Sequence, residues 1–317
     1  MMLPSELNRL FQDEIDSLLV PFSDNKDFYS LIRESLVKIG QDSGVDNVYR
    51  RRFLPLIVCD AICDRSEHAL PACTGIELLN ASAEIFDDIE DADSVESLPA
   101  KYGAPIAINV GSTLIMLAER AFTRLSSRGV DSDTVLNLMD TVNSYYAAAC
   151  SGQHRDLSLT PEKAATEDEY FRVIAMKSAF MVECACYTGA SLAKANQDTF
   201  RLFIGFGHNL GMASQIANDI KGVMSLRDIR KRKITLPVIY ALAQTDGETS
   251  IILNNVFCRP AVEFIYSPEN IRDLLFSTGA IQYTTIKMEL YKQQAADLLI
   301  KLEQIGIKGE QLQQFLI

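Results

Sequence analysis

The chain between residues 75 and 91 reads Gly75-Ile76-Glu77-Leu78-Leu79-Asn80-Ala81-Ser82-Ala83-Glu84-Ile85-Phe86-Asp87-Asp88-Ile89-Glu90-Asp91. Its first half is mostly apolar and has no proline and no further glycine, which predicts a largely buried helix. With ~3.6 residues per turn, Asp87 and Asp91 share one face of this helix, and Asp88 lies about 100° away on its flank. Carboxylates this close repel each other and are costly to desolvate unless a cation lies between them. The stretch predicts either a cation site or a solvated acidic helix end.

The available ligand atoms favour magnesium if a cation binds here. The stretch offers only oxygen ligands, without His or Cys. Mg²⁺ prefers oxygen ligands, keeps several waters and accepts substrate phosphate oxygens as further ligands, so a diphosphate is the expected guest. The solvated helix end stays open as the alternative, because Asp93 and Glu96 continue the acidity into an expected loop.

Composition excludes several classes of function. The 317 residues are 48% hydrophobic and carry a formal net charge of −12, and the largest basic clusters are Arg50-Arg51-Arg52 and Arg230-Lys231-Arg232-Lys233. This charge balance disfavours a nucleic-acid partner, although either cluster could hold a small anion. No signal peptide and no apolar run of about 18 residues is recognisable, so we expect no transmembrane segment.

Cysteine and histidine usage points to a reduced, cytoplasmic protein. Seven cysteines fall mostly inside apolar runs, and an odd number without regular framing does not suggest a disulfide framework. Only three histidines are present. A zinc site or a Ser-His-Asp triad therefore has little support.

Apolar residues recur at helical spacing through most of the chain. Residues 151–156 are expected to break or bend the chain, and residues 228–237 to form a basic loop. No alternating strand pattern and no linker is recognisable, so we expect one all-α domain spanning residues 1–317. Helices are expected at about 5–19, 28–39, 50–63, 75–91, 106–125, 132–149, 167–193, 200–223 and 281–305, with another beginning at Pro237. Asp131 or Ser132 can cap the helix that runs to about residue 149.

Two polar intrusions into apolar helices are further candidate site residues. Lys177 stands among apolar neighbours, where its side chain either extends to solvent or meets an anion. Asn218 and Asp219 interrupt the helix at 200–223. Such residues are usually hydrogen-bonded inside a core, so a structural role is the alternative to ligand binding.

Five ordered motifs resemble those of the trans-isoprenyl diphosphate synthase family of class I terpenoid enzymes. Each resembles one family element at the corresponding interval along the chain. Asp87-Asp88-Ile89-Glu90-Asp91 resembles the family's Asp-Asp-x-x-Asp, and Gly152-Gln153 with Asp156 resembles Gly-Gln-x-x-Asp. Lys177-Ser178-Ala179 resembles Lys-Thr-Ala, and Gln215 with Asp219 resembles Gln-x-x-Asp-Asp. The stretch with Asp228, Arg230, Lys233 and Thr235-Leu236-Pro237 resembles Asp-Leu-Arg-x-x-Lys-x-Thr-Leu-Pro.

The resemblance implies a helical bundle around a deep apolar pocket, in which three Mg²⁺ ions bind the diphosphate of an allylic prenyl substrate. Ionisation then releases pyrophosphate and leaves an allylic cation, and a homodimer is possible. The implied metal ligands are Asp87, Asp88, Asp91, Asn218 and Asp219, the implied catalytic residues are Lys177, Gln215 and Lys233, and the implied substrate-binding residues are Arg51, Arg52, Ser82, Ala83, Gln153, Lys177, Arg230 and Lys233.

The small side chains of Ser82 and Ala83 stand where bulky residues close the pocket floor in short-chain members of the resembling family. We therefore expect a pocket deep enough for a prenyl chain of fifteen or twenty carbons. The substrate expected from the resemblance is an allylic diphosphate of this length.

Several departures concern the expected site for isopentenyl diphosphate, the second substrate of chain-elongating members. Leu54 replaces the last arginine of Gly-Gly-Lys-Arg-x-Arg-Pro, Asn80 replaces a histidine, and Glu96-Ser97 corresponds to an arginine pair. That site would retain only Arg51 and Arg52. The second acidic motif, Asn218 to Gly222, lacks its third acid.

These departures leave four interpretations, which we rank by how well the sequence fits each. A terpene synthase that needs no second substrate comes first, and a chain-elongating prenyl diphosphate synthase second. A peptide prenyltransferase resembling those that modify bacterial competence pheromones comes third. A non-catalytic partner subunit comes last, because such a subunit has no reason to keep costly carboxylates at positions 87, 88 and 91.

Overall fold

The computed structural model describes residues 4–38, 51–63, 66–91, 96–158, 166–258 and 266–316. All regular secondary structure in these ranges is helical, which confirms the predicted all-α fold class. The α-helices in chain order are α1 (Pro4–Leu19), α2 (Lys26–Lys38), α3 (Leu54–Cys63), α4 (Leu70–Asp91), α5 (Leu98–Tyr102), α6 (Ala104–Thr123), α7 (Ser132–Ser158), α8 (Glu167–Ile174), α9 (Phe180–Leu192), α10 (Gln197–Met224), α11 (Arg227–Arg230), α12 (Leu236–Gln244), α13 (Gly247–Phe257), α14 (Pro268–Ser277), α15 (Ala280–Gln304) and α16 (Glu310–Gln313).

Shorter helical pieces connect these elements. One of them, η5, is a π-helix at Ala175–Ala179, and it joins α8 to α9 without a break in the helical path. The 3-10 turns are η1 (Val20–Phe22), η2 (Arg51–Phe53), η3 (Glu67–Ala69), η4 (Ser126–Arg128) and η6 (Gln314–Leu316).

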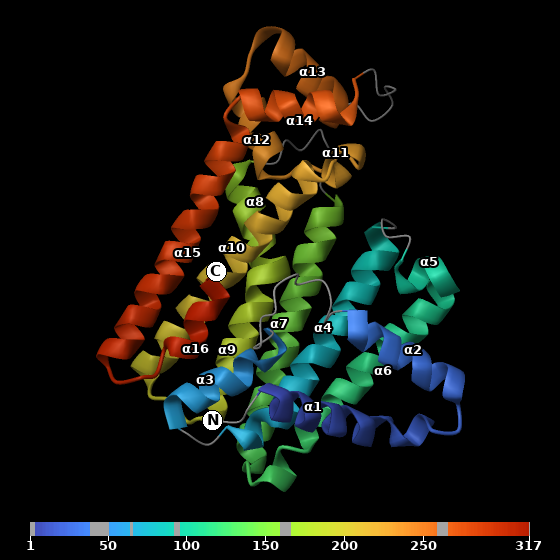
Figure 1. Cartoon of the computed structure of the whole chain (residues 1–317), viewed down its shortest axis with the longest axis vertical. Helices are drawn as coiled ribbons and strands as arrows, with labels where there is room; N and C mark the ends of the chain where they lie inside the picture. Colours follow the sequence, from blue (N-terminus) through green and yellow to red (C-terminus); the bar gives the residue numbers. More distant parts are fainter. Residues whose placement is uncertain are drawn as a thin grey trace.

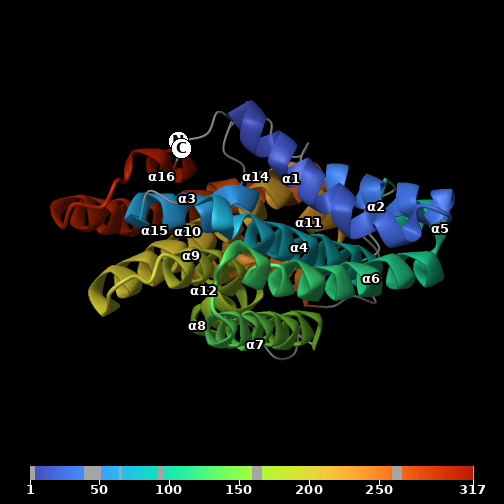
Figure 2. The same cartoon turned by 90° about the horizontal axis from the view of Figure 1, so that it is seen from below.

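The long helices form a bundle. Helix α10 packs along α9 and α15, and α4 packs along α6. Figure 1 shows α13 and α14 crossing one end of this bundle. Figure 2 shows α4, α9 and α10 in the middle, with α1 and α2 on one side and α7 and α8 on the other. The main core contains fully buried rings such as Phe53, Phe122 and Phe206, as expected for helices that bury their apolar faces against one another.

Close packing at one glycine brings α7 against the π-helix. A Cβ atom at Gly152 would overlap the backbone nitrogen of Lys177 and the side chain of Met176. Glycine is therefore required for this approach, and it places Gln153 next to the segment that carries Lys177. A π-helix inserts one extra residue into a turn and is often found at functional sites.

Most expected helices are found, although several boundaries differ, as for α4, which begins at Leu70. Of the two expected caps, Asp131 is the one seen, since its Oδ1 accepts a hydrogen bond from the backbone of Thr134 at 2.9 Å. Residues 151–156 were expected to break or bend the chain, and a break there is wrong, because α7 continues to Ser158. Gly152 is kept there for packing and does not end the helix.

The segment before α12 and the hydropathy of the helices were also compared with expectation. The expected basic loop contains the short helix α11, and α12 follows it from Leu236. Among the described residues, no helix combines the length and the hydropathy needed to cross a bilayer.

Candidate active site

A charged cluster joins three helical segments at the acidic end of α4. Lys177 Nζ lies 3.1 Å from Asp87 Oδ1 and 3.1 Å from Asp156 Oδ2. Lys233 Nζ lies 3.8 Å from the same Asp156 oxygen. Burial lowers the pKa of Lys177, but the carboxylates of Asp87 and Asp156 outweigh this effect and raise the pKa above its usual value. The lysine is therefore a permanent cation among carboxylates.

Gln153 connects the same cluster to the next turn of α4. Its Nε2 donates to Asp87 Oδ1 at 2.8 Å and to Glu90 Oε2 at 2.7 Å. The amide therefore holds two carboxylates of the acidic stretch side by side. Of the two alternatives for the Lys177 side chain, extension to solvent or contact with an anion, the structure shows contact with anions.

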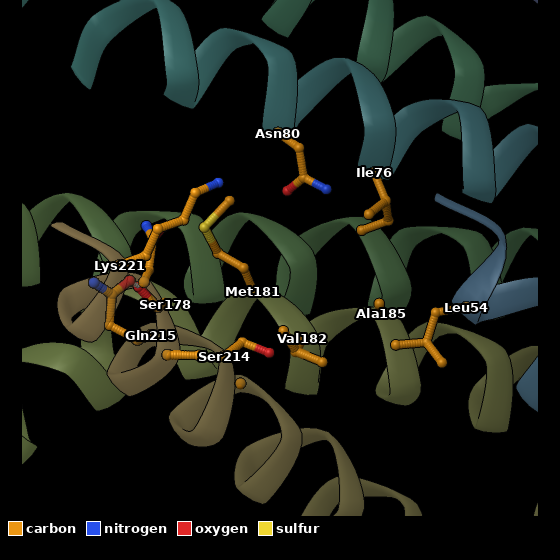
Figure 3. Close-up of a pocket in the computed structure, with 13 residues that line it drawn as sticks. Leu54, Ile76, Asn80, Ser178, Met181, Val182, Ala185, Ser214, Gln215 and Lys221 are labelled. Carbon is orange, nitrogen blue, oxygen red and sulfur yellow. Dashed lines mark hydrogen bonds between the residues drawn. The ribbon is translucent and has the colours of Figure 1, made fainter. Parts of the chain in front are cut away.

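A cavity of about 490 Å³ opens beside this cluster, between α4, α9 and α10. Figure 3 shows Ser178, Gln215 and Lys221 at one end of the cavity, and Leu54 and Ala185 at the other. The cavity therefore has a polar end and an apolar end. The remaining lining residues are Ile76, Asn80, Met181, Val182, Gly211, Ser214, Ala217 and Asn218.

Asp219 lies in a buried hydrogen-bond network and lines a second, smaller pocket together with Asp156, Lys177 and Lys233. It is 3% exposed, and its carboxylate accepts from Tyr170 Oη at 2.6 Å and from Gln215 Nε2 at 2.9 Å. Ser178 Oγ donates to the Gln215 carbonyl oxygen at 2.6 Å. Burial raises the pKa of Asp219 to about 6, although the Tyr170 hydroxyl, the Lys233 charge and the Gln215 amide each lower it.

Arg52 does not face the cavity. Its guanidinium lies 3.2 Å from Glu77 Oε1 in an ion pair whose side chains are 6% and 3% exposed. The same guanidinium lies over the ring of Phe11, 5.0 Å from the centroid. Leu54, at the position of the family's last arginine, is buried at the apolar end of the cavity. Asn80 lines the cavity and accepts a hydrogen bond from Tyr146 at 2.7 Å.

The structure brings about half of the predicted site residues together. Asp88 lies on another side of α4, in a small pocket that it shares with Glu34, Glu84 and Glu96. Arg230 is exposed and does not line the cavity. The side chains of Arg51 and Asp91 lie outside what the structure describes.

The predicted pocket floor does not coincide with the cavity. Ser82 is 2% exposed, and its hydroxyl donates to the backbone oxygen of Gly111 at 3.0 Å. This contact places Ser82 between α4 and α6, and neither Ser82 nor Ala83 lines the cavity. The floor seen in the structure is formed near Leu54, Ile76 and Ala185 instead.

Sequence reasoning also missed functional neighbours. Asp156 was part of a recognised motif but was not assigned a role, and it links the two lysines. Tyr170 gave no local signal, because its partner Asp219 is 49 residues away. Glu77 did give a signal, since a lone acid inside an apolar run needs a cationic partner.

The described residues contain no group of three His, Cys, Asp or Glu side chains placed to hold a metal ion by themselves. At the end of α4, Asp87 and Glu90 come together on Gln153 and offer oxygen atoms only. This donor set fits Mg²⁺, which takes further ligands from water and from substrate phosphate.

Several known proteins resemble this chain in sequence or in fold. The chain is 28% identical over 248 residues to the tryptophan prenyltransferase ComQ of Bacillus spizizenii, covering 77% of this chain and 84% of that protein. It is 33% identical over 220 residues to the geranylgeranyl diphosphate synthase of Sulfolobus acidocaldarius, covering 64% and 66%. A crystal structure of a geranylgeranyl pyrophosphate synthase shares the fold, with a TM-score of 0.82, 22% identity and coverage of 100% and 97%. The polyprenyl synthetase family model matches residues 48–263, so the chain belongs to the polyprenyl synthetase family.

Proposed function

We propose that the protein is a Mg²⁺-dependent prenyltransferase that ionises an allylic prenyl diphosphate of fifteen or twenty carbons and transfers the prenyl group to an acceptor. One observation carries this proposal, namely that Lys177, joined to Asp87 and Asp156, lines a small pocket that shares Gln215 with the polar end of a larger cavity whose other end is apolar. Such a site can bind a diphosphate at one end and a hydrocarbon chain at the other. Its charges are suited to stabilise the leaving pyrophosphate.

The residues around the cluster have separate tasks. When bound, Mg²⁺ would neutralise the diphosphate and act as a Lewis acid on its oxygens, with Asp87 as the described ligand best placed to hold it. Lys177 and Lys233 would exchange their contacts with Asp87 and Asp156 for phosphate oxygens. The apolar wall near Ala185 would exclude water from the cation left after ionisation.

Terpene formation, which the sequence alone ranked first, has no specific support in the comparisons. The named relatives are a prenyltransferase and a diphosphate synthase. Chain elongation, ranked second, fits these relatives better than terpene formation does. Their enzymatic activities also make a non-catalytic subunit the weakest of the four interpretations.

The geometry favours an acceptor that carries no diphosphate. The expected site for isopentenyl diphosphate would retain Arg51 and Arg52, and Arg52 is held by Glu77 and buried under Phe11. Losing a charge-assisted contact typically costs about 1.5–3 kcal/mol, or about tenfold to a hundredfold in affinity. We therefore propose a tryptophan side chain of a peptide as the acceptor, in line with the name of the ComQ relative.

In the proposed reaction, the bond between the prenyl carbon and the diphosphate oxygen breaks, and pyrophosphate leaves with the electron pair. A carbon of the indole ring then bonds to the prenyl carbon, and a proton is released to solvent. Isopentenyl diphosphate is the second candidate acceptor, because the geranylgeranyl diphosphate synthase is the more identical of the two relatives.

One incubation series separates the three reactions. Purified protein, Mg²⁺ and farnesyl or geranylgeranyl diphosphate are combined with a tryptophan-containing peptide encoded beside the gene, with radiolabelled isopentenyl diphosphate, or with no acceptor. We expect the peptide to gain the mass of one prenyl group, and the matching peptide with alanine in place of tryptophan to gain none. Efficient incorporation of the radiolabel would establish chain elongation instead. A hydrocarbon or terpene alcohol formed without any acceptor would establish terpene synthesis.

A further inference from the structure

The polar stretch near the end of α10, from Asn218 to Gly222, presents no carboxylate to the cavity. Gly222 stands at the position of the third acid in the resembling motif. A Cβ atom there would overlap the carboxylate of Asp228, which is itself 2% exposed. The Asp228 carboxylate therefore already occupies the position that the Cβ atom of a third acidic residue would take.

The one acid left in this stretch, Asp219, does not line this cavity but lines a separate small pocket with Asp156, Lys177 and Lys233. It is buried, and both of its oxygens accept hydrogen bonds from protein groups, Tyr170 and Gln215. The packing therefore orients this carboxylate through one protein donor on each of its oxygens.

The two residues of the stretch that do line the cavity are Asn218 and Lys221. Both are exposed there. Asn218 offers a neutral amide, which binds a hard cation less strongly than a carboxylate does. Figure 3 shows the Lys221 side chain extending across the polar end of the cavity, toward the side that α4 forms. The α10 wall therefore presents a cation where the resembling family presents metal ligands.

The net charge of positions 218, 219, 221 and 222 differs from that of the family motif. Asn218 and Gly222 each remove one negative charge relative to an Asp-Asp-x-x-Asp motif, and Lys221 adds a positive one. These positions together are neutral here, with Asp219 and Lys221 cancelling. A diphosphate bound at the polar end still needs positive charge on this side, and a lysine ammonium can supply it directly.

We propose that Lys221 takes the place of the metal ion expected at the second acidic motif, so that its ammonium binds the substrate diphosphate directly and the site holds fewer than three Mg²⁺ ions. This inference rests on the proposed function, since it assumes that a diphosphate binds at the polar end of the cavity. It assigns binding of the leaving group to a residue at a variable position of the second acidic motif. It also predicts that the second stretch no longer recruits metal.

Pyrophosphate binding tests the role of Lys221 without any need for turnover. Isothermal titration at a fixed Mg²⁺ concentration would compare the unmodified protein with Lys221→Met, and Lys221→Arg would serve as the charge-conserving variant. We expect Lys221→Met to weaken binding about tenfold or more, as loss of a charge-assisted contact implies. Lys221→Arg should retain most of the affinity. Lys301→Met, which removes an exposed lysine of α15 far along the chain, should change nothing.

Metal stoichiometry is the second readout. Mn²⁺ bound per chain in the presence of pyrophosphate, measured by electron paramagnetic resonance, should be below three. The double variant Asn218→Asp with Lys221→Met restores an acid and removes the cation, and it should bind additional Mn²⁺.

Equal pyrophosphate affinity in the unmodified protein and Lys221→Met, or three bound Mn²⁺ in the unmodified protein, would overturn the inference and leave the proposed function standing. Failure of the unmodified protein to bind pyrophosphate with Mg²⁺ would overturn both.

Discussion

The acidic ends of α4 and α10 both interrupt an apolar helix, yet their carboxylates lie in opposite environments. The Asp87 side chain is 43% exposed and faces the ammonium of Lys177. Asp219 is 3% exposed and accepts from the neutral groups of Tyr170 and Gln215. A carboxylate at the rim with a cationic partner can exchange that partner for a metal ion and a diphosphate. A buried carboxylate that accepts from neutral groups is held in one orientation by the packing around it.

The role of each acidic residue in these helices follows from the groups that its carboxylate contacts. Glu77 gives a third case in the same helix as Asp87, because it is buried and holds the cation Arg52. Three acids thus have three roles that the sequence does not separate. Substitutions at Asp87, Glu77 and Asp219 are therefore expected to have different effects.

The largest effect is expected at Asp87. Asp87→Ala should lower Mg²⁺-dependent pyrophosphate release from the allylic diphosphate by about a hundredfold to a thousandfold, because it removes the carboxylate best placed to hold the metal at the leaving group. Asp140→Asn is the control, since it removes an exposed acid of α7 outside the charged cluster, and it should keep most of the activity. Near-normal turnover of Asp87→Ala would remove the rim carboxylate from the mechanism.

The second prediction concerns the buried pair. Glu77→Ala should lower the free energy of unfolding by about 3–5 kcal/mol, because it leaves the guanidinium of Arg52 buried without its carboxylate. Urea denaturation measures this change. Replacing both partners, with Arg52→Leu and Glu77→Leu together, should restore most of the stability, since neither charge is then buried. Unchanged stability of Glu77→Ala would mean that Glu77 does not hold Arg52 away from the cavity.

The third prediction is a pH dependence of stability that originates at Asp219. Its pKa is about 6 in the folded protein and about 3.9 in an unfolded chain. The folded state therefore binds the proton more tightly, so the contribution of Asp219 to stability is present below about pH 4 and is lost as the pH rises through about 6. The shift of about two pKa units corresponds to about 3 kcal/mol.

Asp219→Asn should remove this loss. The amide can still pair with Gln215 through its oxygen and with Tyr170 through its nitrogen, because a hydroxyl can also accept. We expect the variant to be more stable than the unmodified protein at pH 7.5 and equally stable at pH 4, as measured by chemical denaturation at both values. The same difference at both pH values would contradict the buried, protonatable state of Asp219.

The smallest effect is expected at the apolar end of the cavity. Ala185→Phe should shift the preference toward shorter prenyl diphosphates by about tenfold, because the added ring fills the floor beside Leu54 and Ile76. Relative kcat/KM for geranyl, farnesyl and geranylgeranyl diphosphate measures the shift. Ser82→Phe should destabilise the packing of α4 against α6 without this change in preference. The reverse pattern would return the pocket floor to Ser82.

Much of the fold followed from residues close together in the chain. The apolar periodicity predicted most helices, and the cap at Asp131 was found where expected. The break at residues 151–156 was not found, because the glycine there serves a contact with a segment 25 residues further along the chain. Helix boundaries depend on such distant contacts, which local patterns do not contain. The predicted homodimer stays a prediction.

The sequence by itself determined the all-α fold, the acidic stretch at 87–91 and the candidate roles of Lys177 and Gln153, because helical periodicity and motif spacing are properties of neighbouring residues. Only the tertiary structure decided that Asp87 faces Lys177, that Asp219 turns inward to Tyr170, and that Arg52 is held by Glu77. These outcomes depend on which side of a helix meets which neighbour, and Asp87 meets Gln153 across 66 residues of chain. A carboxylate takes its charge state and its task from the groups packed against it, and packing is settled only when the whole bundle has formed.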